Sequence, residues 1–144
     1  MNKKIADLRM EMNKVIKGKD DIIVKIIMTV LASGHILLED NPGLGKTTLA
    51  KTFSKATSMQ DNRIQFTPDT MPSDILGYSM YNQREGKMEF VKGPVFTNLL
   101  LADEINRTSS KTQAALLEAM AEATATVDNV TYLSLIHISE PTRL

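Results

Sequence analysis

The 144-residue chain contains no cysteine and no tryptophan, and only 5% of its residues are aromatic. The lack of cysteine excludes disulfide bonds, thiol catalysis and cysteine-ligated zinc, although it does not fix the compartment. An excess of one charge is also missing, because 17 basic residues balance 17 acidic ones. The composition therefore gives no electrostatic footprint for nucleic acid or for a membrane surface.

Long hydrophobic runs are missing as well. No run approaches the length of a membrane span. Charged residues at Lys3, Lys4 and Asp7 stand where a signal peptide would need its apolar stretch. We therefore expect a cytoplasmic protein. The apolar content of 42% is enough for the core of one domain.

Residues 39–48 (EDNPGLGKTT) form a glycine-rich turn between an apolar run and an amphipathic segment. A strand, such a turn and a helix that opens on Lys-Thr form an arrangement that binds nucleoside triphosphates. Gly43 and Gly45 let the backbone curl so that successive N–H groups point into one concavity, which the positive end of the helix also faces. Lys46 is expected to act in catalysis on the β- and γ-phosphates, and Thr47 to be a ligand of Mg²⁺.

The nucleotide-binding residues predicted from this turn are Asn41, Pro42, Gly43, Leu44, Gly45, Lys46, Thr47 and Thr48. The full phosphate-loop pattern has a further glycine where this chain has Asp40. That departure lowers the specificity of the match but removes no donor or metal ligand. The alternative is an ordinary Asn-Pro-Gly turn followed by a helix with a chance Lys-Thr.

A second chemical signal lies at residues 98–104 (NLLLADE). The apolar run fits a strand buried on both faces of a parallel sheet, and open α/β sheets bind ligands at the carboxyl ends of their strands. Asp103 would hold Mg²⁺, mostly through water, alongside Thr47, and Glu104 would polarise the water that attacks the γ-phosphate. Alone, the pattern is equally explained by a helix N-terminus. It gains weight because it follows the glycine-rich turn with strand-like segments between.

Hydrophobic periodicity and turn residues predict the remaining elements. They are helices at 3–15, 20–31, 46–58, 72–76 and from 109 or 110 to 123, strands at 35–39, 63–67 and 98–103, and hairpins at 78–91 and 125–132. Asp20 is expected to cap the second helix, Gly34 to follow it at the C′ position, and Ser109 or Ser110 to cap the last helix. His35 begins a buried strand and is expected to be a satisfied core residue. The first hairpin has an alternative, a surface loop.

Seven segments follow one another along residues 15–132. They are IKGK (16–19), GHILLEDNPGLGKT (34–47), RIQFT (63–67), PSDI (72–75), GPVF (93–96), LADEINR (101–107) and KTQAALLEAM (111–120). In this order they resemble the MoxR family of AAA+ ATPases, whose members tolerate Asp at the first glycine position of the loop.

The resemblance implies an α/β fold, the parallel sheet with flanking helices of P-loop NTPases. It also implies Mg²⁺-ATP hydrolysis in a homo-oligomeric ring, often a hexamer, whose sites are completed by neighbours. A chaperone-like role would follow, in which client complexes are remodelled or matured, often with von Willebrand factor A domain partners and without nucleic acid. Ile16 and Gly18 would lie near the adenine. The hairpin at 78–91 would be the helix-2 insert that lines the central face of the ring.

Residues 133–143 (LSLIHISEPTR) resemble the translation of a transposase sequencing adapter. We therefore expect residues 1–132 to be a partial AAA+ ATPase domain and residues 133–144 to be a non-native tail. The alternative is a real strand at 133–138 with a polar tail. In the family, the sensor-1 strand, the arginine finger and a helical lid with sensor 2 would follow.

The family's strand order, 5-1-4-3-2, places strand 4 between the two motif-bearing strands, and here strand 4 would fall after residue 132. An empty place leaves those strands about 10 Å apart, with unpaired backbone groups. The apolar tail can be drawn into that gap without an evolved register. We therefore expect the 144-residue chain to lack ATPase activity and to be unstable.

Two other functions are compatible with these motifs. A nucleotide-gated module that does not hydrolyse ATP would have no need of Glu104 beside the metal ligand. A GTPase is disfavoured because its guanine-reading Asn-Lys-x-Asp is missing. The Asn-Lys pair at Asn13-Lys14, for example, is followed by Val15 and Ile16, with no Asp in the fourth place.

Overall fold

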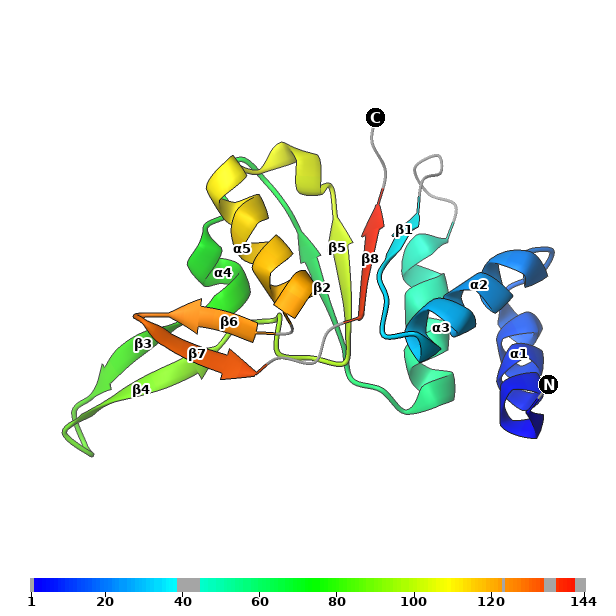
Figure 1. Ribbon diagram of the computed structural model, residues 1–144, viewed down its shortest axis with the longest axis horizontal. Coiled ribbons are helices and arrows are strands. Elements are labelled where there is room, and N and C mark those ends of the chain that lie inside the picture. The colour runs from blue at the N-terminus through cyan, green and yellow to red at the C-terminus, as the bar shows by residue number, and fades with distance from the viewer. Residues whose placement is uncertain (1, 39–44, 123, 134–136, 142–144) are drawn as a thin grey trace.

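The computed structural model describes residues 2–38, 45–122, 124–133 and 137–141. A parallel four-stranded sheet lies at its centre, in the order β1-β8-β5-β2 (Figure 1). The strands are β1 (Ile36–Leu38), β2 (Asp61–Gln65), β5 (Leu99–Asp103) and β8 (His137–Pro141). The predicted α/β class with a parallel sheet is confirmed, and so is the placing of the two motif-bearing strands on either side of one further strand.

Strand β8 fills the place between β1 and β5. Its residues run parallel to both neighbours, with Ser139 opposite Ile36 and His137 opposite Leu99. The backbone edges expected to face an empty gap therefore have a partner strand. The alternative strand predicted at 133–138 instead covers His137–Pro141. The predicted second strand, 63–67, is also displaced, to Asp61–Gln65.

Helices cover both faces of the sheet (Figure 1). On one side lie α1 (Lys3–Val15), α2 (Asp20–Leu31) and α3 (Lys46–Thr57), and on the other α4 (Pro72–Leu76) and α5 (Ser110–Glu122). Leu99 packs among the first group, whereas Leu100 and Ala102 pack with α4 and α5. Because successive side chains of a strand point to opposite faces, β5 is buried on both sides, as its apolar run predicts.

The junction of α1 and α2 corrects the predicted capping role of Asp20. Lys19 is the N-cap residue of α2 and makes no side-chain capping bond, so Asp20 is the first residue of the helix. Its carboxylate is instead bound by the Arg9 guanidinium, whose Nε lies 2.6 Å away, and by Asn13 Nδ2 at 2.7 Å. A charged partner on α1 therefore takes the oxygen atoms that a cap would use.

The end of α2 differs from its prediction by one residue. Ser33 holds the left-handed conformation, with φ of 53°, and its N–H donates to the Val30 carbonyl. Gly34 follows it and donates to the Thr29 carbonyl at 2.8 Å. This pair of bonds is a Schellman motif, in which the left-handed C′ residue is Ser33 and not Gly34. At the start of α5, the Thr112 N–H donates to Ser109 Oγ, which confirms one of the two predicted caps.

Two antiparallel hairpins stand beside the sheet. One pairs β3 (Gly77–Asn82) with β4 (Lys87–Lys92), and the other pairs β6 (Thr124–Val127) with β7 (Val130–Leu133). Asp128 and Asn129 in the second turn both have positive φ, as a two-residue type I′ turn requires. Both predicted hairpins are confirmed, and the surface-loop alternative for the first is wrong.

The β3–β4 hairpin follows α4 without a connecting loop, because the start of β3 and the end of β4 pass very close to one another. Gly77 has φ of 98°, and a Cβ at this position would lie 2.1 Å from the Val91 carbonyl oxygen. Only glycine fits such a crossing, so the predicted stop of α4 at Gly77 has both a conformational and a steric cause. None of the helices in the described ranges combines the length and apolarity needed to span a bilayer.

Candidate nucleotide site

The candidate site lies at the carboxyl edge of the parallel sheet. Strand β1 ends at Leu38, and α3 begins at Lys46. Gly45, the N-cap of α3, has φ of 83°, a left-handed conformation that glycine adopts at no steric cost. The first turn of a helix offers N–H groups without intrahelical partners, which favour an anion. The predicted binding residues Asn41, Pro42, Gly43 and Leu44 lie outside the described residues.

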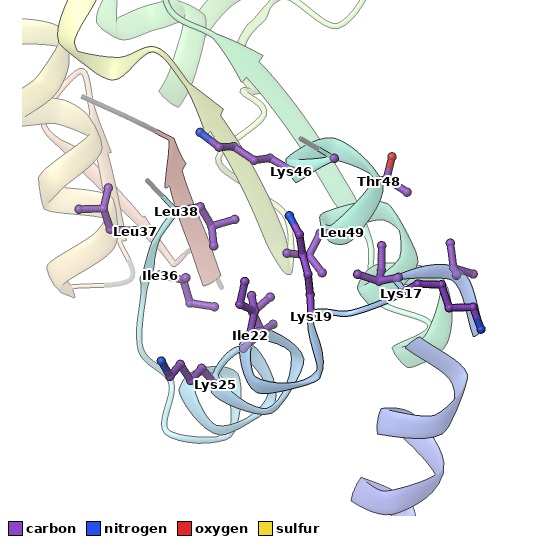
Figure 2. A pocket seen from close by; sticks show the side chains of 14 residues that line it. Lys17, Lys19, Ile22, Lys25, Ile36, Leu37, Leu38, Lys46, Thr48 and Leu49 are labelled. Carbon is purple, nitrogen blue, oxygen red and sulfur yellow. The ribbon is translucent and has the colours of Figure 1, made fainter. Parts of the chain in front are cut away.

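The first turn of α3 carries the three predicted polar residues. Lys46 and Thr47 are half-buried, whereas Thr48 is exposed. Figure 2 shows the Lys46 side chain extending from this turn toward the central strands. The helix itself packs against β5, through Leu49 and Phe53 around Leu99. Lysine and hydroxyl groups are therefore held at one end of a helix that is fixed by apolar contacts.

Asp103 and Glu104 close β5, and each of the two carboxylates is bound by an arginine. Arg63 Nε donates to Asp103 Oδ2 at 2.6 Å, and Arg107 Nη1 donates to Glu104 Oε2 at 2.7 Å. The Asp103 side chain is only 14% exposed, whereas that of Glu104 is 44% exposed. The less accessible carboxylate is thus the one predicted to serve the metal.

The backbone at Glu104 is left-handed, with φ of 58°, where it leads from β5 into the short 3-10 helix η1 (Ile105–Arg107). This conformation is uncommon for a residue other than glycine, asparagine or aspartate. Such strain persists where the surrounding structure holds it, often at functional positions. Here the Arg107 N–H donates to the Glu104 carbonyl at 3.0 Å, so both backbone and side chain of the pair are joined.

A largely apolar cavity of about 470 Å³ lies beside the first turn of α3 (Figure 2). Its walls come from the α1–α2 junction, α2, β1 and the start of α3, and include Ile16, Ile22, Ile36, Leu38 and Leu49. Its size and character fit a planar base. Lys46 and Thr48 belong to the same cavity, so the structure brings the predicted Ile16 together with the phosphate-loop residues.

The remaining predicted residue near the base, Gly18, lies between two cavity-lining residues, Lys17 and Lys19, and is itself exposed. Its φ of 72° turns the chain between α1 and α2. The polar side chains of the described lining are four lysines and one threonine, with no carboxylate or amide among them.

The donor atoms suit Mg²⁺ by their chemistry. Thr47 offers a hydroxyl and Asp103 a carboxylate, which are the hard oxygen ligands that Mg²⁺ prefers. No three His, Cys, Asp or Glu side chains converge in the described ranges. That finding is compatible with Mg²⁺, which usually takes one or two protein carboxylates and completes its shell with water and substrate phosphates.

Sequence reasoning missed three features of the site. The partners Arg63 and Arg107 depend on strand register and on the turn after β5. The lysines Lys19 and Lys25 line the cavity, although the sequence analysis gave neither of them a role. A signal existed only for Arg107, because it lies three residues after Glu104 along a turn. His35 has the predicted partner, since its Nε2 lies 2.7 Å from the Met120 carbonyl oxygen. It is only half-buried and precedes β1, whose residues are half-buried or exposed, so its prediction as a core residue that begins a buried strand is wrong.

Comparison with known proteins gives consistent results. The profile of the family described as "ATPase family associated with various cellular activities (AAA)" matches residues 35–138. The uncharacterized protein YeaC of Bacillus subtilis is 51% identical over 119 residues, which cover 83% of this chain and 37% of that protein. Chaperone MoxR1 of Mycobacterium tuberculosis is 41% identical over 122 residues, covering 85% of this chain and 32% of that protein.

A solved structure agrees. The crystal structure of a Cytophaga hutchinsonii protein, provisionally described as an ATPase, matches with a TM-score of 0.84 and 41% identity, covering 98% of this chain and 44% of that one. The class that the fold and the site define is thus the P-loop ATPases of the AAA+ type. The chain belongs to the MoxR family of these ATPases. It spans about a third of the length of the relatives MoxR1 and YeaC.

Proposed function

We propose that the protein containing this chain binds ATP with Mg²⁺ and hydrolyses it. The observation that carries the proposal is the position of the first turn of α3 at the same edge of the sheet as Asp103 and Glu104, with an apolar cavity beside it. Lys46 binds the β- and γ-phosphates, the residues from Asn41 to Thr48 surround them, and Ile16 and Gly18 border the base.

Metal binding and activation of water are assigned to three further residues. Thr47 and Asp103 hold Mg²⁺, which neutralises phosphate charge when it is bound. Glu104 takes part as the base that polarises the attacking water. In the described structure its carboxylate is bound by Arg107, and an exposed pair of this kind contributes only about 0.2–1 kcal/mol. Re-aiming Glu104 toward a water molecule therefore costs little.

The wider role follows from the family. We propose a homo-oligomeric ring, with a hexamer the leading candidate, that acts as a cytoplasmic, chaperone-like machine. MoxR1 carries the name chaperone, which supports this role. Clients or von Willebrand factor A domain proteins would be the partners. The β3–β4 hairpin, which stands away from the sheet, would line the central face of the ring (Figure 1).

The C-terminal residues 133–144 are proposed to be a non-native tail. Supporting this, β8 occupies an interior place in the sheet, yet Pro141 lies opposite Leu38 and has no N–H for the ladder. Proline is ordinarily confined to edge strands, to bulges or to the first residue of a strand. The 144-residue chain is therefore expected to lack turnover. Steady phosphate release by this chain with Mg²⁺-ATP, together with a cooperative thermal melt, would contradict that expectation.

The site assignment is tested with Lys46→Ala in the uninterrupted protein, by which we mean the longer protein that contains this chain and a complete AAA+ domain. Loss of a charge-assisted contact to phosphate should weaken the binding of a fluorescent ATP analogue by about 1.5–3 kcal/mol, or roughly 10- to 150-fold. Lys51→Ala is a suitable control, because Lys51 lies on the same helix but is exposed and does not line the cavity. Equal affinity of the Lys46→Ala variant and the parent would show that the site lies elsewhere.

A second candidate function is a nucleotide-gated module that signals by shape without hydrolysis. The bond from Arg107 to Glu104 is the observation that favours it, because Glu104 can act on water only after this bond is broken. The two functions share every binding residue. They differ only in whether Glu104 carries turnover.

A further inference from the structure

Arg63 reaches Asp103 across two neighbouring strands of the parallel sheet. Strands β2 and β5 lie side by side (Figure 1), and the residue opposite Arg63 is Leu101. Asp103 therefore lies two positions further along β5, on the same face, and the long arginine side chain spans that diagonal. Its Nε ends 2.6 Å from Asp103 Oδ2.

The pair is asymmetric in its exposure. The Asp103 side chain is 14% exposed and that of Arg63 is 50% exposed, so the guanidinium lies on the solvent side of the carboxylate. Among the described residues, the only side chain that donates to Asp103 is Arg63, and the bond is to Oδ2. One oxygen of the carboxylate is fixed, and the other remains available to a ligand.

We propose that Arg63 is a positioning residue for Asp103, which holds Oδ2 so that Oδ1 serves the metal. This inference rests on the proposed Mg²⁺-ATP function and deepens it. Carboxylates that bind metals are themselves held by hydrogen bonds, and loss of such a partner typically lowers metal affinity by about 10- to 100-fold. The opposite relation, in which Arg63 competes with the cation for the carboxylate, predicts tighter metal binding once Arg63 is removed.

Arg107 does not share this role. Its partner Glu104 is the more exposed carboxylate, and the two residues belong to one turn. Their bond therefore joins residues that are already close in the chain and links no second strand to the site. Arg63 instead joins β2 to the metal-site end of β5. Replacing Arg63 should therefore change the affinity for the metal, whereas replacing Arg107 should change the orientation of the Glu104 side chain.

The test uses the uninterrupted protein and two measurements. Mn²⁺ affinity is followed by electron paramagnetic resonance at a saturating concentration of a non-hydrolysable ATP analogue, and the affinity of a fluorescent ATP analogue is measured in EDTA. Arg63→Gln should weaken Mn²⁺ binding by about 10- to 100-fold while changing the metal-free nucleotide affinity less than about twofold. Arg63→Lys, which keeps the charge but loses the planar fork, should fall between.

The control is Arg84→Gln, which removes an equal charge from the exposed turn between β3 and β4 and should change neither affinity. Unchanged or tighter Mn²⁺ binding in Arg63→Gln would overturn the positioning role. Parallel loss of metal-free nucleotide affinity would also overturn it, because it would show a merely structural role. If the parent itself binds no nucleotide, the proposed function fails, and this result is distinct from a failure of Arg63 alone.

Discussion

The ring of Phe90 stacks on that of Tyr132, with centroids 3.9 Å apart and planes inclined by 10°. Phe90 belongs to the β3–β4 hairpin and Tyr132 to the β6–β7 hairpin, so this contact joins the two ribbons. Phe96 meets both rings edge-on, with centroids at 5.6 and 6.4 Å. The two hairpins therefore share an aromatic joint and are expected to move as one body.

Loss of the stack between Phe90 and Tyr132 should lower the free energy of unfolding, and the effects of the two substitutions should not be additive. In a double-mutant cycle of Phe90→Leu and Tyr132→Leu, we expect a coupling free energy of about 0.5–1.5 kcal/mol, measured by urea unfolding of the uninterrupted protein. Tyr81→Leu on the same hairpin is a control, because Tyr81 is 58% exposed. Additive effects of Phe90→Leu and Tyr132→Leu would mean that the stack does not join the hairpins.

The α1–α2 junction should make stability depend on acidity. Hydrogen bonds from Arg9, and then from Asn13, lower the pKa of Asp20 from its ordinary value of 3.8 to about 2. Because the folded pKa lies below the unfolded one, the stabilisation is complete above the ordinary value and is lost as the pH falls through about 2. Asp20→Asn should therefore flatten the loss of stability between these two pH values.

The measurement is the urea midpoint of the parent and of Asp20→Asn at several pH values. Asp21→Asn, at an exposed neighbouring position, provides the control. If the parent and Asp20→Asn lose stability with the same slope over this range, the carboxylate does not carry the effect.

The apolar character of the cavity predicts modest selection of the base. A pocket without a matched polar group discriminates related ligands by only about 10- to 200-fold, whereas a built hydrogen-bonding reader reaches about 10⁴-fold or more. The described lining has lysines and one threonine as its polar side chains. We therefore expect ATP to be preferred over GTP by less than about 200-fold in competition with a fluorescent ATP analogue. A preference near 10⁴-fold would require a polar reader that this lining lacks.

The sequence predicted correctly those features that depend on residues close to one another in the chain. The Asp128-Asn129 turn, the buried run of β5 and the stop of α4 at Gly77 each depend on residues close in sequence, and all three are confirmed. The partner of Asp20 could not be predicted, since the capping preference of an aspartate lost to an arginine eleven residues earlier on another helix.

In the candidate site, too, the contiguous motifs could be predicted and the contacts between separate strands could not. The glycine-rich turn and the two carboxylates stand out in the sequence because they are contiguous, and the sheet brings their strands to one edge. The bond from Arg63 to Asp103 follows from the register of β2 against β5, which no periodicity reveals. The insertion of β8 between β1 and β5 agrees with the place that the family's strand order leaves there, but its bounds, His137–Pro141, are displaced from the apolar pattern at 133–138.

Glu104→Gln in the uninterrupted protein tests the central claim most directly, by steady-state phosphate release alongside Mg²⁺-ATP binding. The substitution keeps size and hydrogen bonding but removes the negative charge, so binding should persist while turnover falls by about 10²–10⁴-fold. Glu11→Gln is the matched control, because Glu11 also accepts from a cation three residues later, Lys14, but on the surface of α1. It should turn over at the parental rate. Parental turnover by Glu104→Gln would contradict the catalytic role and leave the non-hydrolysing module as the better account.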